Sequence, residues 1–575
     1  MADRANEPAA APAEKIPPAT ALPAPPPALA AKAHDLEAIR AAVVDAAGIS
    51  AGLWLSYLFV LFYLLIAAGG VKHTDLFFEK AVRLPFLNVD LPLKGFFWLG
   101  PALFLVVHAY VLLHFVLLAG KIRVFDHEMR TQITRQNVRR RLRRQLPSNI
   151  FVQLLAGPRE ARRGMTGFLL ELIAWISLVI GPVALLVFFE LQFLPYHDPW
   201  ITWWQRIAVV IDLALLWTLW PAIVHRERIQ VTGRRTRRAP LVILAFMSLA
   251  ALPLIFLIAT FPGEWIDSKL RGLWPISPVR KALVAGRIDY AAGKPESLWS
   301  NVLVLPGLDA IDHGQFDSEA KIAAARETIS LRARDLKGAV LIGAVLRKVD
   351  FTAADLRGAR LRDADLRDAN FACAVTYYST TEFPRCTQLQ GASLQGASLQ
   401  GASLQRAQLQ GASLESARLQ GTVLVLAQLQ GASLRGANLQ SAWLEGAELQ
   451  GARLNGAKLE GASLANVFVW RADIRAAEAQ GARIDNAETG AKQRCDRGVC
   501  EWSAAALDAL RKHILEEVPP GRERDAALAR LDPVLDPAKE LAGEAEMAQA
   551  WADLQRASAN AGDGEAAALV GDLYA

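Results

Sequence analysis

His108, His114, Glu171 and Asp212 are ionisable side chains inside long apolar segments of the sequence, and they are the candidates for proton or ion chemistry. His108 and His114 fall within the second of five apolar runs, Glu171 lies near the start of the third, and Asp212 lies about 10 Å into the fourth. Burying such groups in lipid is costly, so they usually face a partner or a cavity. Their depths predict that His114 lies near Glu171, and that Asp212 lies near Tyr63 or His108.

Three uses of these groups stay open from the sequence alone. They could form static polar pairs that hold neighbouring helices together, they could line a proton or ion path, or the histidines could ligate haem. Static pairing is the preferred interpretation, and no cofactor is expected.

Motifs of the common enzyme classes are missing. A Gly-x-Ser-x-Gly match occurs at Gly48, Ser50 and Gly52, but a nucleophile elbow needs a strand before the serine and a helix after it. Here the match stands at the start of an apolar run. The sequence contains no phosphate loop, dinucleotide fingerprint, zincin motif or paired CxxC site. We therefore predict no enzymatic activity and no metal site.

The four cysteines form two local pairs, Cys373 with Cys386 and Cys495 with Cys500. If this part of the chain is exported, each pair is expected to form a disulfide. If it stays in the cytoplasm, four reduced thiols are expected instead. A metal site is less favoured, because neither pair has a second Cys or His pair close by in sequence.

The apolar runs that carry these groups have the length of membrane spans. Each approaches the ~20 residues that cross a ~30 Å hydrocarbon core, and tryptophans near their ends, including Trp54, Trp98 and Trp220, are expected to anchor them at the headgroups. The runs are 51–70, 96–119, 167–189, 205–224 and 240–261. The chain is therefore expected to be an integral membrane protein with about five transmembrane helices, in contact with the lipid bilayer.

Loop charges predict the orientation of these spans, because cytoplasmic loops collect Lys and Arg. Segment 120–164 has twelve basic residues against three acidic ones, and segment 225–239 has six Arg against Glu227. Both should be cytoplasmic, although Arg-rich segments also bind lipid headgroups or nucleic acid. The N-terminus is then inside and everything after residue 261 is outside. In the inner membrane of a Gram-negative bacterium, that side is the periplasm.

Two segments precede the first span. Residues 1–33 are rich in Ala and Pro and should be disordered, and residues 34–48 suggest a short amphipathic helix at the membrane surface.

A five-residue period begins at Leu336 and, after an insertion between residues 372 and 388, resumes at Leu389. A helix would spread leucines spaced by five over all of its faces, and a flat strand would alternate them between two sides. The chain must instead turn by a fixed angle at every unit, so that each central Leu and the Ala two residues before it point inward. A coil with four sides satisfies this requirement.

The units ADLRG, ANFAC and QGASL resemble those of the pentapeptide repeat family over residues 331–490. This resemblance implies a right-handed quadrilateral β-helix, whose interior is filled by the central Leu or Phe and the preceding Ala. The core positions that it implies include Leu394, Leu399, Leu404, Leu434, Leu439, Ala392, Ala397 and Ala432.

The expected organisation is thus an α-helical transmembrane bundle followed by this solenoid and short flanking helices. Its segments are 1–50, the spans 51–261, a linker or N-terminal cap 262–330, the repeats 331–490 and a helical C-terminal region 491–575. Within the last segment, helices are expected at about 503–517 and 538–558, as caps or flanking pieces of the stack. DNA mimicry by the repeats is disfavoured, because residues 330–490 have eighteen basic against fifteen acidic side chains; no nucleic-acid partner is expected. The leading hypothesis is a membrane-anchored scaffold that binds a protein partner. The alternative is a component of a transporter, channel or membrane sensor that uses Asp212, His108, His114 and Glu171.

Overall fold

The computed structural model describes residues 27–84, 89–158, 160, 164–224, 239–264, 266–267, 276–285, 288–289, 294–374, 385–495, 498–519, 521–536 and 543–560. The chain divides into two compact units. Unit 1 contains Met1–Ser56, Val111–Trp175 and Leu219–Arg234, and unit 2 contains Tyr57–Tyr110, Ile176–Thr218 and Arg235–Ala575. Unit 2 therefore holds one end of four long helices together with the whole repeat region.

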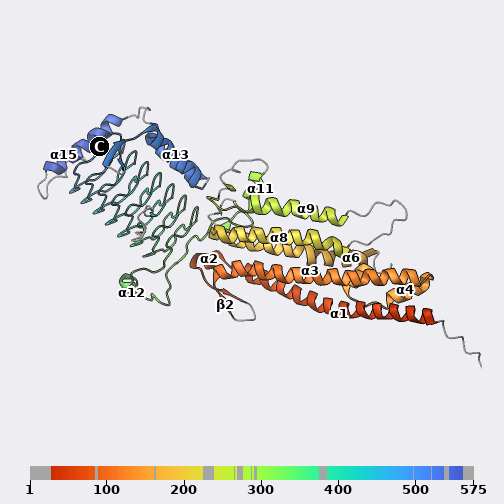
Figure 1. The fold of residues 1–575 in the computed structure, drawn as a ribbon. Helices are drawn as coiled ribbons and strands as arrows, with labels where there is room; N and C mark the ends of the chain where they lie inside the picture. Colours follow the sequence, from red (N-terminus) through yellow and green to blue (C-terminus); the bar gives the residue numbers. More distant parts are fainter. Residues whose placement is uncertain are drawn as a thin grey trace, which may run out of the picture. The chain divides into compact units, whose positions relative to one another are not determined.

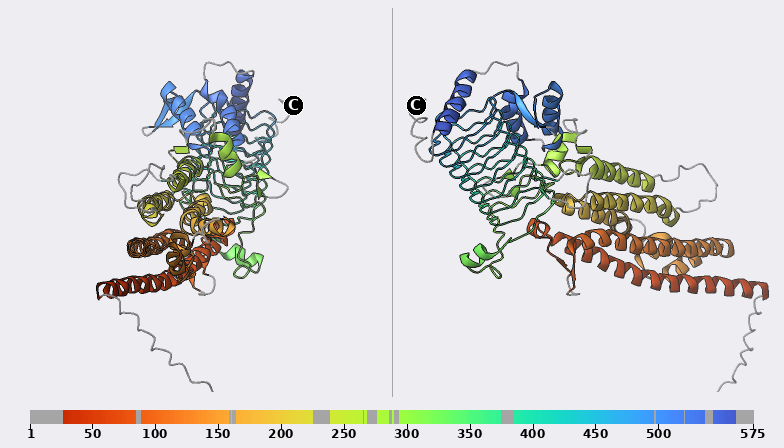
Figure 2. Two further views of the ribbon diagram at one scale, coloured as in Figure 1. Left: turned by 90° about the vertical axis from the view of Figure 1, so that its right-hand side faces the viewer. Right: turned by 60° about the vertical axis from the view of Figure 1, so that its left-hand side comes forward.

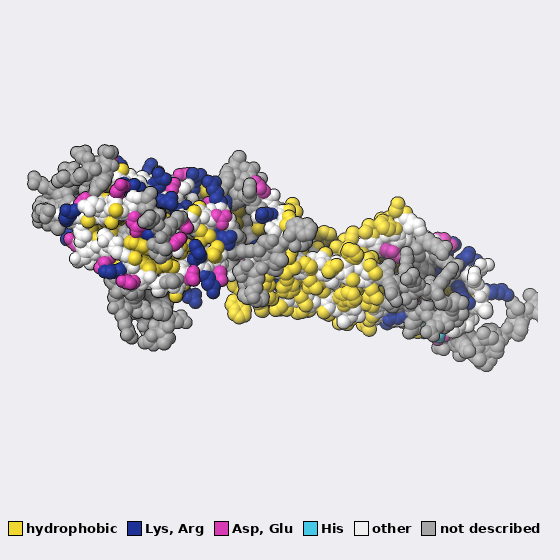
Figure 3. All heavy atoms as spheres, turned by 90° about the horizontal axis from the view of Figure 1, so that it is seen from above, with side chains coloured by type: hydrophobic (Ala, Val, Ile, Leu, Met, Phe, Trp, Pro, Cys, Tyr) yellow, Lys and Arg dark blue, Asp and Glu magenta, His cyan; other side chains and the backbone are white. Residues whose placement is uncertain are grey.

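Five helical segments of the described chain are long and apolar enough to cross a membrane. They are Leu36–Gly69, Leu93–Gln132, Gly164–Tyr196, Pro199–Val224 and Leu241–Ile258. Hydrophobic side chains form a broad apolar surface over them (Figure 3), as expected where lipid rather than water covers a helix. Their number and approximate positions confirm the five apolar helices predicted from the sequence.

Two of these segments are interrupted by a π-helical turn. The segments are built from α1 (Pro27–Gly69), α3 (Leu93–Gln132), α6 (Gly164–Trp175), η1 (Ile176–Ile180), α7 (Gly181–Phe193), α8 (Pro199–Val224), α9 (Ala239–Pro253) and η3 (Leu254–Ile258) (Figure 1). The π-turns η1 and η3 lie beside Pro182 and Pro253. Proline has no N–H for the carbonyl one turn earlier, so each proline releases a backbone carbonyl for another partner.

Helix α1 differs from the prediction. It runs without a break, so the surface helix predicted for residues 34–48 and the first span are one element. After Pro27 this segment contains no proline, and Gly48 or Gly52 costs only about 1 kcal/mol in a helix interior. Residues 1–26, for which disorder was predicted, lie outside the described residues.

The predicted cytoplasmic loop after α3 is helical within unit 1. It contains α4 (Gln136–Arg144) and α5 (Ile150–Ala156). Asn149 caps α5 by accepting a hydrogen bond from Phe151 N at 2.9 Å, and its Nδ2 donates to Ala47 O at 2.9 Å. Arg143 forms an ion pair with Asp126 of α3. The second basic segment, 225–238, lies outside the described residues.

The tryptophans do not all serve as headgroup anchors. Trp220 is only 2% exposed and packs edge-on against Trp175 in unit 1, with ring centroids 5.0 Å apart. Its role is internal packing, whereas Trp98 remains half exposed.

The repeat region forms a stack of coils, visible in Figures 1 and 2. Parallel β-bridges one residue long join positions twenty apart, such as Arg418 with Asn438 and Ser433 with Arg453. Hydrogen bonds run both ways between neighbouring coils: Leu434 N donates to Arg453 O at 2.7 Å, and Arg453 N donates to Ala432 O at 2.9 Å. The coils thus pair through short bridges rather than long strands, and each coil rests on its neighbours.

The interior of the stack follows the prediction. Every predicted core residue is at most 1% exposed, namely Leu394, Leu399, Leu404, Leu434, Leu439, Ala392, Ala397 and Ala432. The glycine two residues after most central leucines has a left-handed backbone, for example Gly431 with φ of 62°. L-residues other than glycine seldom adopt this conformation, so the repeated glycine lets the chain turn each corner.

The stack begins earlier than the sequence pattern suggested. Val304 and Asp309 bridge to Val340 and Val345, and Leu305 N donates to Val340 O at 2.8 Å. Part of the predicted linker 262–330 is therefore the first, incomplete coil. The sequence pattern did not reveal this coil, because Leu303 replaces the alanine that normally stands two residues before the central position, here Leu305.

C-terminal elements lie against the stack. They are β5 (Lys492–Cys495), β6 (Gly498–Glu501), α13 (Ala504–Glu517), α14 (Arg522–Leu535) and α15 (Glu544–Asn560). Helices were predicted for residues 503–517 and 538–558, but α14 was missed. Helix α15 packs on the last coils, where Trp551 Nε1 donates to Ala472 O and Ile484 N donates to Ser558 Oγ, both at 2.9 Å.

Small elements connect these parts. They are α2 (His73–Phe78), β1 (Val82–Arg83), β2 (Asp90–Leu91), η2 (Leu194–Tyr196), α11 (Ile276–Leu283), β3 (Ile288–Asp289), β4 (Lys294–Pro295) and α12 (Glu319–Ala324).

Candidate functional site

A polar site is completely buried among the apolar helices of unit 2. His108 of α3 and Asp212 of α8 are both 0% exposed, and His108 Nδ1 lies 2.6 Å from Asp212 Oδ1. The other ring nitrogen, Nε2, lies 3.2 Å from the carbonyl oxygen of Leu178 in η1. Tyr57 stacks on the His108 ring with centroids 5.6 Å apart. The pairing of Asp212 with His108 is one of the two that depth in the sequence suggested.

Pro182 leaves the backbone carbonyl beside His108 without its usual helical donor. The carbonyl of Leu178 lies four residues before Pro182, so the proline cannot donate the hydrogen bond that a regular helix would supply. His108 Nε2 lies within reach of that carbonyl. The neighbouring carbonyl of Ser177 accepts a hydrogen bond from the Tyr57 hydroxyl at 2.8 Å. Side chains from two other helices thus contact backbone carbonyls that the proline leaves without a helical donor, as buried carbonyls require.

The geometry fixes how many protons the pair holds. Nε2 carries the hydrogen donated to Leu178 O, and a second proton must lie between Nδ1 and Asp212 Oδ1, because two lone pairs would repel at 2.6 Å. With that proton on either atom, the pair is electrically neutral. Asp212 Oδ2 is buried without a hydrogen-bond partner among the described residues. A proton can move between His108 Nδ1 and Asp212 Oδ1 without changing the net charge of the pair, which stays at zero inside the bundle.

The other two predicted residues lie in unit 1. His114 of α3 is half-buried and Glu171 of α6 is exposed. Their predicted proximity stays a prediction.

A second buried ionic group lies nearer the start of α8, in unit 2. Arg206 and Glu190 are both 0% exposed, and Arg206 Nε donates to Glu190 Oε1 at 2.8 Å. Arg206 also donates from both terminal nitrogens to the carboxylate of Glu264, and from Nη2 to Ala259 O at 2.7 Å. One guanidinium therefore joins α7, α8 and the segment that follows η3. Bidentate pairing of this kind is strong and geometrically specific.

The segment after η3 also contacts the first coils of the stack. Phe261 stacks on His197 with centroids 5.3 Å apart, and Thr260 O accepts a hydrogen bond from Asn301 Nδ2 at 2.9 Å. His197 Nε2 lies 2.7 Å from Asn301 O, and its Nδ1 lies 3.1 Å from Asp335 Oδ1. The ends of the helices and the base of the β-helix are therefore joined by buried polar contacts within one unit.

Charged residues strengthen this joint. Lys337 Nζ lies 2.8 Å from Asp335 and 3.2 Å from Asp355. Burial alone would raise the pKa of Asp335, but the hydrogen bond and charge of His197 and the Lys337 ammonium lower that pKa to about 2. Asp335 is therefore ionised at neutral pH and attracts both partners.

Two further contacts tie α2 to the same base. Val304 N donates to His73 Nδ1 at 3.0 Å, and burial lowers the pKa of His73 to about 4. Arg334 forms an ion pair with Glu79 and lies over the ring of Tyr196, 4.3 Å from its centroid. His73 thus stays neutral, as an acceptor of a backbone N–H must.

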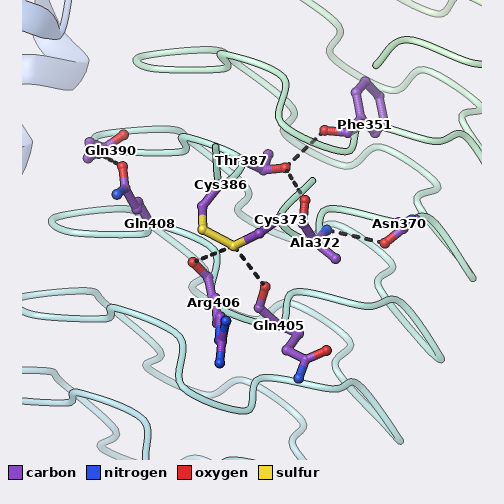
Figure 4. The surroundings of a disulfide bond; sticks show 10 residues. All are labelled: Phe351, Asn370, Ala372, Cys373, Cys386, Thr387, Gln390, Gln405, Arg406 and Gln408. Atoms are coloured by element: carbon purple, nitrogen blue, oxygen red, sulfur yellow. Dashed lines mark hydrogen bonds between the residues drawn. A yellow bond between two sulfur atoms is a disulfide. The ribbon is translucent and has the colours of Figure 1, made fainter. Parts of the chain in front are cut away.

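One predicted cysteine pair is joined. Cys373 and Cys386 form a disulfide at the base of the insertion, with Cys373 Sγ beside Gln405 O and Arg406 O (Figure 4). Across the insertion the bridged positions are thirty-three apart, as for Asp355 and Gln388. The two cysteines are thirteen apart in sequence, which equals the excess over the regular twenty. The disulfide therefore closes the extra segment where the coil resumes its register. The side chains of Cys495 and Cys500 lie outside the described residues.

The C-terminal helices cover one corner of the stack. Helix α14 lies on a column of corner glycines: a β-carbon on Gly411 would lie 2.9 Å from Ala527 Cβ, and one on Gly451 would lie 2.5 Å from Val534 Cγ2. Arg530 donates from Nε to Gly411 O at 2.9 Å. Only glycine leaves room for the helix here, so this corner is closed to any other protein.

No group of three or more His, Cys, Asp or Glu in the described part of the chain is arranged to hold a metal ion.

Comparison with known proteins agrees with the repeat geometry. The family described as "Pentapeptide repeats" matches residues 335–371, 385–421, 412–451 and 452–488, with eight copies. The repeat region of this chain is a member of the pentapeptide repeat family, whose fold is a right-handed β-helix. No curated protein matches the chain significantly.

Several solved structures are similar over the repeats. HetL, a pentapeptide repeat protein involved in heterocyst differentiation regulation from the cyanobacterium Nostoc sp. strain PCC 7120, is 29% identical, with 28% of this chain and 82% of HetL covered and a TM-score of 0.20. QnrB1, a plasmid-mediated fluoroquinolone resistance protein, is 17% identical, with coverages of 28% and 92% and a TM-score of 0.18. A pentapeptide repeat protein from the thylakoid lumen of Arabidopsis thaliana is 22% identical, with coverages of 24% and 89% and a TM-score of 0.11. At these TM-scores the likeness adds nothing to the family assignment.

Sequence reasoning missed Tyr57, the Leu178 carbonyl and the Arg206 group. Pro182 in the middle of an apolar run was the available signal, because it predicts a free carbonyl four residues earlier. Glu190 and Arg206 could have been found from the sequence, because they are opposite charges at the end of one apolar run and the start of the next.

Proposed function

We propose that this chain is a membrane-anchored interaction protein of the bacterial inner membrane, whose β-helix is displayed on the non-cytoplasmic side for a protein partner. The observation that carries the proposal is the joint at the base of the stack. His197, Asp335 and Asn301, together with the His73 contact to Val304, hold the β-helix to the helix ends through buried contacts. A flexible tether would have no such contacts.

The surface and the cysteines support this role. The interior is filled by Leu and Ala, while outward positions are mostly Gln, Ser and Gly, so the stack offers a rigid polar surface rather than a ligand cavity. The Cys373–Cys386 disulfide and the basic loops favour an exported repeat region. The proposed role involves no catalysis.

Copurification from membranes in mild detergent tests the proposal. Proteins retained by the full chain, but not by a chain lacking residues 331–490, would support binding by the β-helix. The same proteins retained by both chains would contradict it, because the partner would then bind the helices.

A second candidate function is a proton-responsive sensor or proton path through the helices. The neutral His108–Asp212 pair beside a π-turn favours it, since π-turns occur often at functional sites. In liposomes with a trapped pH dye, the wild-type protein should pass protons faster than Asp212→Asn. Equal fluxes for both proteins would remove this candidate, and a scaffold would be indifferent to the substitution.

A further inference from the structure

The outward surface of the stack contains one cluster of large apolar side chains. In the described stretch 388–466, the large apolar residues at outward positions are Val423, Val425, Leu426 and Trp443. Val423 and Trp443 are bridge partners in neighbouring coils, and Trp443 is 57% exposed. These four residues form the Trp443 patch. Gln, Ser, Gly or charged residues occupy most of the surrounding outward positions.

Leu426 is a costly residue at its position. It stands at a corner where the neighbouring coil has Gly446, and its φ is 58°. A left-handed backbone costs an L-residue roughly 1–2 kcal/mol relative to glycine. The Leu426 side chain lies over that corner, since a β-carbon on Gly446 would be 2.8 Å from its Cδ2, and the rest of the side chain remains partly exposed.

Elsewhere on this stack, outward apolar residues serve as contact points. Phe468 lies under the guanidinium of Arg494 at 5.4 Å, and Trp470 packs with Leu507 and Val534 of the C-terminal helices. Near the base, Val345 packs against a cluster that includes Phe316. In the same chain, an apolar residue facing outward thus marks a place where another segment packs. In the Trp443 patch, Trp443 is exposed and the other three residues are half-buried.

The charges around the patch indicate the chemistry of its occupant. Glu445 and Glu460 stand at the corners on either side of the Trp443 face, and both side chains are half-buried. In each, one carboxylate oxygen is buried without a hydrogen-bond partner in the described part of the chain, so its negative charge is not neutralised by a donor there. A tryptophan face attracts a cation, and a carboxylate beside it strengthens that attraction. Backbone groups take no part, because Trp443 N and O are already bonded to Thr422 O and Leu424 N. An added strand is therefore excluded.

We propose that the Trp443 patch binds a segment of another protein that presents an apolar side chain next to a Lys or Arg. The apolar side chain packs on Val423, Val425 and Leu426, and the cation lies over Trp443 between Glu445 and Glu460. This inference rests on the proposed interaction role and specifies its surface. The patch is small compared with a stable dimer interface of about 800 Å² per partner, which favours a short segment over a second copy of this chain.

Photo-crosslinking of the full chain in membranes tests the assignment. p-Benzoylphenylalanine replaces Trp443, which preserves an aromatic ring, and in a control it replaces Lys458, which is exposed on a neighbouring side of the stack. We expect an adduct with another protein from position 443 only. Mass spectrometry of the adduct should map the contact to a segment with an apolar residue beside Lys or Arg.

The affinity of a synthetic peptide of that mapped segment then shows how much each residue of the patch contributes to binding. Trp443→Ser, Glu445→Gln with Glu460→Gln, and replacement of the peptide's basic residue by Gln should each weaken binding about tenfold. Arg483→Ala, two coils away on the same side, should leave binding unchanged. Equal affinity for wild type and Trp443→Ser would overturn the proposal, provided both proteins melt at the same temperature.

Other outcomes also overturn it. An adduct with a second copy of this chain would make the patch a self-association surface, an adduct with lipid would make it a membrane contact, and an adduct within the same chain would mean that it is covered internally. No adduct at position 443, with partners still copurifying through the β-helix, would leave the interaction role intact and reject this surface.

Discussion

A β-carbon placed on Gly431 would lie 2.9 Å from the Cα of Leu531, so helix α14 rests directly on the backbone of the stack. Gly431 also has φ of 62°, which strains any other residue. Gly431 is thus required for two separate reasons, the close approach of α14 and the left-handed turn. Gly421 is a control in which only the second reason applies: its φ is 63°, but a β-carbon added there would meet no described atom within 4 Å.

We predict that Gly431→Ala releases α14, whereas Gly421→Ala does not. Both variants should lose roughly 1–2 kcal/mol of stability from the left-handed corner. Only Gly431→Ala adds a steric clash, so limited proteolysis should cleave between α13 and α14 faster in that variant alone. Equal cleavage rates in the two variants would show that the contact with Leu531 does not hold the helix.

The interior of the stack should not accept charge. Leu434 is 0% exposed, and Leu434→Asp would bury an unpaired carboxylate, at a cost large enough to unfold the surrounding coils. Arg435, the next residue, faces outward and is exposed. Circular dichroism of Arg435→Asp should match wild type. A stable, soluble Leu434→Asp protein would argue against the inward register.

Stability of the repeat region should depend on Glu448. Burial raises the pKa of Glu448 to about 7, against the opposing effects of Arg494 and of the hydrogen bond from Gln430. The folded state therefore holds this proton more tightly than the unfolded state does. The protonated Glu448 therefore contributes to the free energy of unfolding. This contribution is fully present below about pH 4.5 and is lost as pH rises through about 7, which lowers the free energy of unfolding by roughly 3 kcal/mol.

Glu448→Gln should accordingly raise the unfolding midpoint at pH 8 and leave it nearly unchanged at pH 4.5. Glu478→Gln serves as the control, because that side chain is 58% exposed. The prediction fails if the midpoints of wild type and Glu448→Gln keep a constant difference between pH 4.5 and 8.

The orientation prediction rests on loop charge. A reporter enzyme that is active only outside the cytoplasm should work when fused after residue 300 and fail when fused after residue 140. Activity in the reverse pattern would move the repeat region into the cytoplasm.

The cysteines provide an independent measurement. Alkylation under denaturing conditions without reductant should leave Cys373 and Cys386 unmodified, and the mass should show whether Cys495 and Cys500 are paired as well. On the chain-entropy account, closing a loop of this length stabilises by about 3 kcal/mol, so replacing both Cys373 and Cys386 by Ser should lower the melting temperature. Four alkylated cysteines would contradict both the disulfides and the exported orientation that they support.

Regular features of the molecule were predictable because each depends on local spacing. Leu434 and Ala432 were assigned to the interior from the five-residue period, and His108 was matched with Asp212 from helix depth. Both inferences rest on the regular geometry of one element. In a helix each residue advances by about 1.5 Å, and in the stack each five-residue unit makes one corner, so the position of a side chain follows from its residue number.

Contacts between distant elements were not predictable in this way. Glu264 reaches Arg206 across fifty-eight residues, and nothing in either local sequence identifies the partner. Helix α14 was missed because Pro533 lies inside it and its apolar residues are few. Gly391, Gly411, Gly431 and Gly451 form a column of corner glycines spaced twenty residues apart. Each is already required by the left-handed turn of its corner, so the sequence contains no separate sign that they also make room for a helix.

The hydrogen bond from Ile484 N to Ser558 Oγ has a consequence for how these molecules behave when crowded together. A stack of parallel coils ends in an open rim of backbone donors and acceptors, onto which a neighbouring molecule could add its own coils and begin a fibre. Ser558 occupies a donor on that rim and α15 lies over the last coils, while the first coil at the opposite end is engaged by His73 and His197. Removal of α15 should therefore cause the molecules to assemble into filaments before the stack unfolds.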